Sequence, residues 1–108
     1  MQILLNEIAH GRSGDKGDTS NICVFARKPE YYEIIKREVT PERLRKFFGN
    51  MVQGEIVRYD IPSLGGFNFV LYKALGGGAT MSLRLDSLGK SMGSAIMRLK
   101  INVSDGEL

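Results

Sequence analysis

The sequence predicts a single α+β domain. A chain of 108 residues, 43% hydrophobic and 25% charged, has the size and composition of one globular unit. After a first strand, the predicted elements run strand, helical segment, strand, strand, helix, strand. That order is the split βαββαβ pattern of ferredoxin-like folds. We therefore expect a ferredoxin-like domain with an additional N-terminal strand over residues 1–103, and a polar tail over 104–108.

The N-terminal half is predicted to contain two strands and two helices. Apolar residues over 2–9 favour a strand, and the continuous apolar run 22–26 is typical of a buried strand in the middle of a sheet that is covered on both faces. Proline fits the first turn of a helix, so a helix is expected to begin near Pro29. A second helix is predicted over 40–49, with Thr40 as its N-cap.

The C-terminal half begins with a predicted hairpin over 54–75, in which Pro62 and the glycines after it form the turn. Beyond it, apolar residues at helical spacing favour a helix over 80–90, although Leu83 and Leu85 also alternate as in a strand. Apolar and polar residues alternate clearly over 94–103, which predicts a strand with one wet face. The tail is expected to fray.

The polar, glycine-rich segment from His10 to Asn21 lies between two predicted strands, and we interpret it as a functional loop. Its glycines permit positive φ and close approach of a ligand. The strands at 22–26 and 67–75 are expected to lie side by side and antiparallel, so this loop should meet residues 76–80 at one edge of the sheet. A helix beginning at residue 79 or 80 would direct free backbone N–H groups there, which favours an anion.

The expected site draws on both glycine-rich segments. The candidate ligand-binding residues are Arg12, Ser13, Lys16, Thr19, Asn21, Gly76, Gly77, Gly78 and Thr80. The candidate catalytic residues are His10, as a general acid or base, and Asp15 and Asp18, which would orient it or move a proton themselves. The structural alternative is that the two aspartates and Thr19 only satisfy loop backbone groups, while the glycines only allow tight packing.

Several motifs of known chemistry are incomplete in this chain. Ser13 does not sit in a nucleophile elbow, because Asp15 stands where that motif needs glycine. The glycine spacing matches neither a dinucleotide fingerprint nor a phosphate loop, so no nucleotide cofactor is expected. With one histidine and one cysteine, a usual four-ligand zinc site is not expected, and we predict no metal. Cys23, inside an apolar run, is interpreted as a core residue.

The charge pattern does not favour nucleic acid. The net charge is +3, and the basic residues are spread along the chain instead of forming a block. The densest basic segment, 36–46, is interleaved with glutamates and is typical of a solvated helix face. No apolar run approaches the roughly 20 residues that span a bilayer, and the N-terminus lacks a signal sequence. We therefore expect a cytoplasmic protein without membrane contact.

The segment from His10 to Ile22, together with Asn68-Phe69-Val70, 75–78 and 82–86, resembles the small C-terminal ferredoxin-fold domain of the AtuA-like family. The resemblance covers nearly the whole chain. Members of that family accompany acyclic terpene utilisation and related acyl-CoA catabolism in bacteria, and the domain occurs alone or fused to a larger AtuA-type domain. The resemblance implies the ferredoxin-like fold and draws attention to both glycine-rich segments, but it brings no settled catalytic mechanism.

Two functions are compatible with these patterns. The first is a binding or accessory subunit, forming a homo-oligomer or docking on a larger AtuA-like subunit, whose segments 10–21 and 76–80 contribute to a site for a small anion or acyl thioester. The alternative is a small hydratase, lyase or isomerase acting on an acyl thioester or carboxylic acid. In that enzyme His10 or an aspartate would move a proton, while Arg12 and Lys16 stabilise negative charge.

Overall fold

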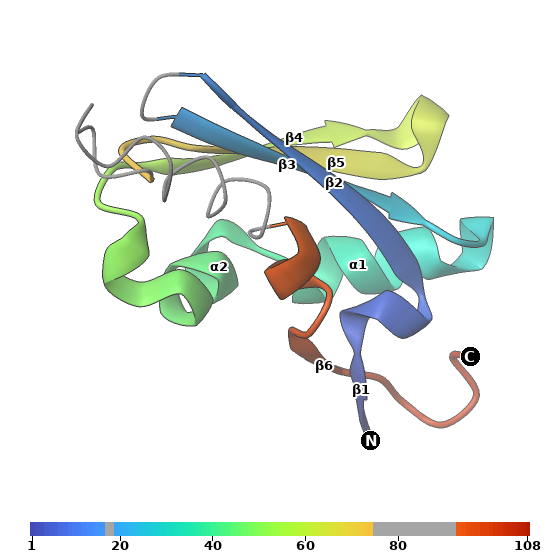
Figure 1. Cartoon of the computed structure of the whole chain (residues 1–108). Coiled ribbons are helices and arrows are strands. Elements are labelled where there is room, and N and C mark those ends of the chain that lie inside the picture. Colours follow the sequence, from blue (N-terminus) through green and yellow to red (C-terminus); the bar gives the residue numbers. More distant parts are fainter. Residues whose placement is uncertain (17–18, 75–92) are drawn as a thin grey trace.

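The computed structural model describes residues 1–16, 19–74 and 93–108 and contains a four-stranded antiparallel sheet with its helices on one side (Figure 1). The strand order is β2-β3-β5-β4, formed by Ala9–Lys16, Thr19–Ala26, Gly66–Leu71 and Ile56–Ile61. A separate antiparallel pair joins β1 (Gln2–Leu4) to β6 (Lys100–Asn102). This mixed architecture confirms the predicted ferredoxin-like α+β class.

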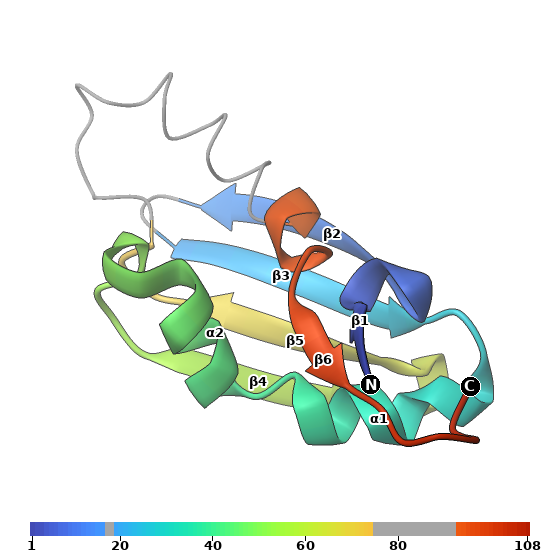
Figure 2. The ribbon, with the colours of Figure 1, turned by 90° about the horizontal axis from the view of Figure 1, so that it is seen from below.

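Two short α-helices, α1 (Tyr32–Glu38) and α2 (Pro41–Phe48), lie across one face of the sheet (Figure 2). Thr40 is the N-cap of α2, as predicted: its side-chain oxygen accepts a hydrogen bond of 3.2 Å from the backbone N–H of Arg43. Residues 93–96 are also α-helical. Short 3₁₀ turns lie at Leu5–Glu7 (η1), Pro29–Tyr31 (η2), Gly49–Met51 (η3) and Pro62–Leu64 (η4).

The hydrophobic core fills the space between the sheet and these helices. Alternate residues of the two central strands are buried toward the helices, as the period of two in a strand requires. The main contributors from the strands and the helices are Ile22, Val24, Phe67, Phe69, Leu71, Ile34, Ile35 and Leu44. The sheet is therefore covered on one face, and the intervening residues of the same strands point to the other side.

The segment predicted as a loop, from His10 to Asn21, is instead most of a β-hairpin. The register of β2 and β3 is continuous from the pair Ala9–Ala26 to the pair Lys16–Thr19. The loop interpretation was wrong because polar residues and glycines also suit an edge strand with one exposed face. A Cβ atom on Gly11 would lie 2.9 Å from Cε of Met97, so this glycine permits close packing.

The strands predicted near the two termini were too long. Residues 5–7 form η1, and in the segment 94–103 residues 94–96 are helical, leaving only residues 100–102 in a strand. The edge position beside β3 is occupied by β2, while the C-terminal strand pairs with β1. The 54–75 hairpin is confirmed, although β5 ends at Leu71. The helix predicted over 80–90 lies outside the described residues.

Hydrogen bonds hold the C-terminal tail, contrary to the expected fraying. The guanidinium of Arg37 donates to both carboxylate oxygens of Glu107, at 2.9 and 3.2 Å. The backbone N–H of Val103 also donates to the carbonyl of Met1, at 2.9 Å. Pairing with Arg37, helped by a hydrogen bond from Ser104, lowers the pKa of Glu107 to about 2. The tail is therefore tied to α1 by an exposed ion pair.

This ion pair makes stability depend on pH. Because the pKa of Glu107 falls from 4.5 to about 2 on folding, its contribution is fully present above pH 4.5 and is lost as the pH falls toward 2. We expect Glu107→Gln to lower the urea midpoint slightly at pH 7, and the difference from wild type to shrink at pH 2. Asp105→Asn, which alters the neighbouring carboxylate, should have no such effect. A Glu107→Gln defect of equal size at both pH values would contradict this account.

Candidate functional site

The face of the sheet that points away from α1 and α2, here called the open face, is not covered by any described helix (Figure 1). The strand register aligns four residues across this face: Arg12 of β2, Cys23 of β3, Asn68 of β5 and Tyr59 of β4. Adjacent strands lie about 4.8 Å apart, so neighbours in this row are within side-chain contact range.

Asn68 lies at the centre of a small hydrogen-bonded cluster on the open face. Its side-chain oxygen accepts a hydrogen bond of 3.3 Å from Nδ2 of Asn21 and one of 3.6 Å from the thiol of Cys23. All three residues are half-buried, and Cys23 lies on the open face outside the hydrophobic core, so its interpretation as a core residue was wrong. The side-chain oxygen is therefore occupied, whereas Nδ2 of Asn68 has no acceptor among the described residues. An amide arranged in this way offers a donor to a ligand.

The charge on the open face is positive. Arg12 is exposed and directly opposite Cys23 in the β2–β3 register. At the described side-chain positions of the four strands, this face carries no carboxylate, because its other residues are amides, aromatic and apolar residues, small residues and His10. A guanidinium on the same face as the amide donor of Asn68 is suited to a carboxylate or phosphate group.

His10 lies on the same face as Arg12, two residues earlier in β2. Its ring stacks on Phe25, with the ring centroids 5.6 Å apart. The Phe25 ring in turn lies over Gly66 of β5, where an added Cβ would meet Cδ1 of Phe25 at 2.5 Å. The absence of a side chain at Gly66 thus lets Phe25 lie flat and hold the imidazole at one end of the open face.

Ser13 lies on the opposite face from Arg12. Its hydroxyl accepts a hydrogen bond of 3.1 Å from the backbone N–H of Gly93, in the helical segment 93–96. A Cβ on Gly93 would be 2.8 Å from Oγ of Ser13, so the two segments are in close contact. The structure therefore does not bring Ser13 together with Arg12, and gives Ser13 a contact on the covered side.

Of the other predicted site residues, some are placed by a side-chain contact, some by backbone pairing only, and some lie outside the described residues. Asn21 is on the open face in contact with Asn68, while Lys16 and Thr19 form the last pair of the β2–β3 ladder. The backbone of Asp15 pairs with Ser20. The remaining candidates, Asp18, Gly76, Gly77, Gly78 and Thr80, lie outside the described residues. Because Ser20 also pairs with Leu71, the start of β3 and the end of β5 do meet, as predicted.

Sequence reasoning did not select Asn68 or Tyr59 as site residues. Asn68 had one usable signal, since it is a lone amide between the buried Phe67 and Phe69 in an otherwise apolar strand. A polar residue at that alternating position is expected on the uncovered face of a sheet. Its neighbours, however, become known only when the register of three strands is known.

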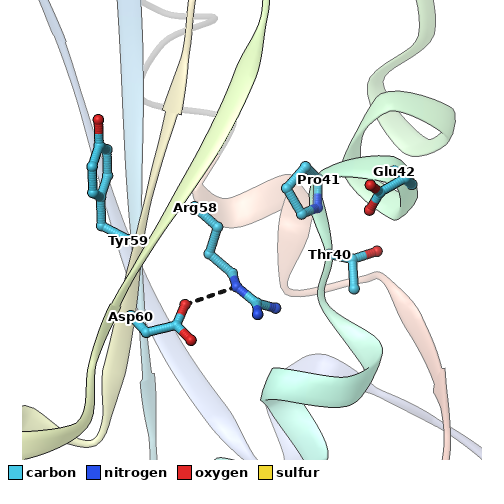
Figure 3. A pocket seen from close by; sticks show the side chains of 6 residues that line it. All are labelled: Thr40, Pro41, Glu42, Arg58, Tyr59 and Asp60. Atoms are coloured by element: carbon cyan, nitrogen blue, oxygen red, sulfur yellow. Dashed lines mark hydrogen bonds and ion pairs between the residues drawn. The ribbon is translucent and has the colours of Figure 1, made fainter.

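A pocket between β4 and the start of α2 contains a second arginine, Arg58 (Figure 3). The guanidinium of Arg58 donates to Asp60 at 2.9 Å and to the carbonyls of Lys36 and Val39 at 2.8 and 3.0 Å. These carbonyls lie at the C-terminal end of α1, where a cation is favoured. Arg58 thus joins β4 to α1 through Nη1 and pairs with Asp60 through Nε, which distinguishes it from Arg12.

Tyr32 contributes an unpaired hydroxyl to the covered side of the sheet. Its ring stacks on Phe67 with centroids 4.7 Å apart, and Arg58 lies over the same phenylalanine ring, with Cζ 5.3 Å from its centroid. The hydroxyl is buried and has no hydrogen-bond partner among the residues described. Burial raises the pKa of Tyr32, and the charges of Asp60 and Glu33 raise it further against the opposing effect of Arg58.

The described residues provide little else that points to a particular ligand. Within 1–16, 19–74 and 93–108, no three histidine, cysteine, aspartate or glutamate side chains gather as metal ligands do. Over the same ranges, no helix has the length and apolar character needed to cross a membrane.

Fold and open face together define a ferredoxin-like domain with an arginine and amide donors on its uncovered sheet face. A family model described as the AtuA ferredoxin-like domain matches residues 3–102. The chain therefore belongs to the AtuA ferredoxin-like domain family. It has no match among curated proteins and none among solved structures.

The lack of a described hydrogen-bond partner for the buried Tyr32 hydroxyl, on the covered side of the sheet, can be tested by its effect on stability. A buried hydroxyl without a partner costs free energy, so we expect Tyr32→Phe to raise the free energy of unfolding by about 1 kcal/mol. Urea denaturation followed by circular dichroism measures the change. Tyr31→Phe, at the neighbouring half-buried tyrosine, is the matched control and should be neutral. A loss of stability on Tyr32→Phe would show that the hydroxyl does have a partner.

Proposed function

We propose that this chain is a small binding or accessory subunit whose open face contributes to a site for an anionic ligand, such as a carboxylate or the phosphate-bearing end of an acyl-CoA thioester. One observation carries the proposal. Asn21 and Cys23 occupy the side-chain oxygen of Asn68, so the free group of that amide is a donor, on the same row as the exposed guanidinium of Arg12.

The geometry suits an anion lying over Cys23. Arg12 and Asn68 flank this residue on the two neighbouring strands, so their Cα atoms are about 10 Å apart, or two strand spacings. The arginine side chain is long enough to bend across one spacing, and its planar donors match a carboxylate or phosphate. With no described carboxylate on this face of the strands, nothing there opposes the approach of negative charge.

An accessory role fits the family better than independent catalysis. Likeness to AtuA-like proteins supports a role in acyl-CoA or terpene catabolism, with a larger AtuA-like subunit or a second copy of this chain as the partner. A hydratase, lyase or isomerase that used His10 would need a proton-transfer partner beside that residue. The ring contact recorded for His10 among the described side chains is instead with Phe25. We therefore propose binding.

Titration of the ¹⁵N-labelled protein with acetate, phosphate and acetyl-CoA tests the proposal. We expect saturable amide shifts at Arg12, Cys23 and Asn68 with at least one of these anions. Loss of one charge-assisted hydrogen bond is worth about 1.5 kcal/mol, so Arg12→Ala should weaken binding roughly tenfold. Asn68→Asp should weaken it at least as much, because it replaces a donor with a negative charge.

Lys46→Ala is the matched control, since it removes an exposed cation from α2 on the covered side of the sheet. It should leave the affinity unchanged. Equal affinities for wild type, Arg12→Ala and Asn68→Asp would contradict the proposal, as would the absence of saturable shifts with all three anions.

A further inference from the structure

A second cavity lies at the other end of the sheet from the β2–β3 connection. It has a volume of about 470 Å³ and lies where β3 leads into η2, next to the η4 turn that joins β4 to β5. Its walls include Arg27, Lys28, Pro29, Tyr32, Pro62 and Leu64, and we call it the basic pocket. Small-molecule sites commonly have volumes of about 300–1,000 Å³, so its size is sufficient for one.

The two sides of the basic pocket are held together by backbone hydrogen bonds. The N–H of Ala26 donates to the carbonyl of Gly65 at 2.8 Å, and the N–H of Gly65 donates to the carbonyl of Pro62 at 3.0 Å. Gly65 has a φ of 63°, which favours glycine there. Pro29 and Pro62 each begin a 3₁₀ turn with a fixed φ. The pocket is therefore largely preformed, which lowers the entropic cost of binding.

The charge of the basic pocket is uncompensated. Arg27 and Lys28 contribute two cations, and none of the lining residues is an acid. Nε of Arg27 donates to the carbonyl of Asn6 at 3.0 Å, which orients the guanidinium while its terminal nitrogens have no acceptor among the described residues. Neither cation is in an ion pair with a described carboxylate. Nζ of Lys28 lies over the ring of Tyr31, 5.9 Å from its centroid, a contact that does not neutralise its charge. Two adjacent cations without a described carboxylate partner at the rim of a cavity favour an anion.

The remaining wall of the basic pocket is apolar. Leu64 is 65% exposed, among the most exposed large hydrophobic side chains of the described chain. It lies in the same pocket as Pro29, Pro62 and Tyr32. A ligand that covered Leu64 would remove apolar surface from water. Cations together with an exposed apolar wall fit a ligand that has a charged end and a hydrocarbon body.

We infer that the basic pocket is a second ligand site, separate from the open face, and that it binds an amphipathic carboxylate, that is, a carboxylic acid with an aliphatic body. The carboxylate is held by Arg27 and Lys28, and the aliphatic body lies against Leu64 and the two prolines. The cations alone would not select a ligand with an aliphatic body, and the apolar wall alone would not select a carboxylate. The ligand therefore needs both its charged end and its aliphatic body.

Octanoate, kept below its micelle concentration, is the probe, with acetate and octanol as matched ligands that lack the aliphatic body or the charge. In ¹H–¹⁵N spectra of the whole chain we expect saturable shifts at Lys28, Leu64 and Gly65, and tighter binding of octanoate than of either matched ligand. Lys28→Ala and Leu64→Ser should each weaken octanoate binding about fivefold or more. Lys46→Ala and Arg12→Ala should leave the octanoate titration of the pocket amides unchanged, because Arg12→Ala affects only carboxylate binding on the open face, and the spectra themselves verify folding.

The affinities compared are those reported by the amides of Lys28, Leu64 and Gly65, and the absence of saturable octanoate shifts at these pocket amides would overturn the inference. So would acetate or octanol binding as tightly as octanoate, or unchanged affinity in both pocket variants. The open-face site is tested by shifts at Arg12, Cys23 and Asn68, whereas the basic pocket is tested by shifts at Lys28, Leu64 and Gly65. Failure of one proposal can therefore be told from failure of the other.

Discussion

The alternation of side chains along the β2–β3 hairpin is the constraint on which the rest of the structure depends. The register places Arg12 opposite Cys23 and Ser13 opposite Ile22, so adjacent residues point to opposite faces of the sheet. A slip of one residue would turn Ser13 outward and bring Arg12 into the core. Burial of Ile22 and Val24 prevents such a slip and so fixes which polar groups reach the open face.

The covered side of the sheet supports this arrangement with its own polar contacts. Arg58 is held by Asp60 and by two carbonyls at the end of α1, and Arg37 joins α1 to the C-terminal tail. Both arginines are thus committed to holding the helices and the tail in place. Arg12, by contrast, is exposed on the uncovered face with no acceptor among the described side chains, which leaves it available for a ligand.

Local signals in the sequence were sufficient for much of the fold. The Thr40 cap, the hairpin over 54–75 and a central strand at 22–26 depend on neighbouring residues, and all three are confirmed. The strand is covered on one face of the sheet, however, and not on both. The hairpin over 9–26 was missed because an edge strand with one exposed face has the composition of a loop. The helical segment 93–96 was missed because it is held in part by a contact between Gly93 and Ser13. These residues are 80 positions apart, so no local pattern in the sequence indicates the contact.

The candidate site was predictable only in part, for the same reason. Arg12 and Asn21 were selected from composition, and both lie on the open face. Asn68 was not selected, because its partners Asn21 and Cys23 belong to another strand. Only the register of β3 and β5 shows that they are neighbours. Ser13 was predicted to lie with Arg12 because a loop does not fix the directions of neighbouring side chains. In a strand, adjacent side chains point to opposite faces of the sheet, so the two residues lie apart. Composition thus identified the right segment, and strand pairing determined which of its residues act together.

The hairpin itself is tested most directly by nuclear Overhauser contacts between β2 and β3. The register from Ala9–Ala26 to Lys16–Thr19 predicts cross-strand Hα–Hα contacts at alternate pairs, including the glycine positions. A spectrum without contacts between residues 10–16 and 19–25 would contradict it, because the segment would then be a loop and Arg12 would have no fixed place beside Cys23 and Asn68.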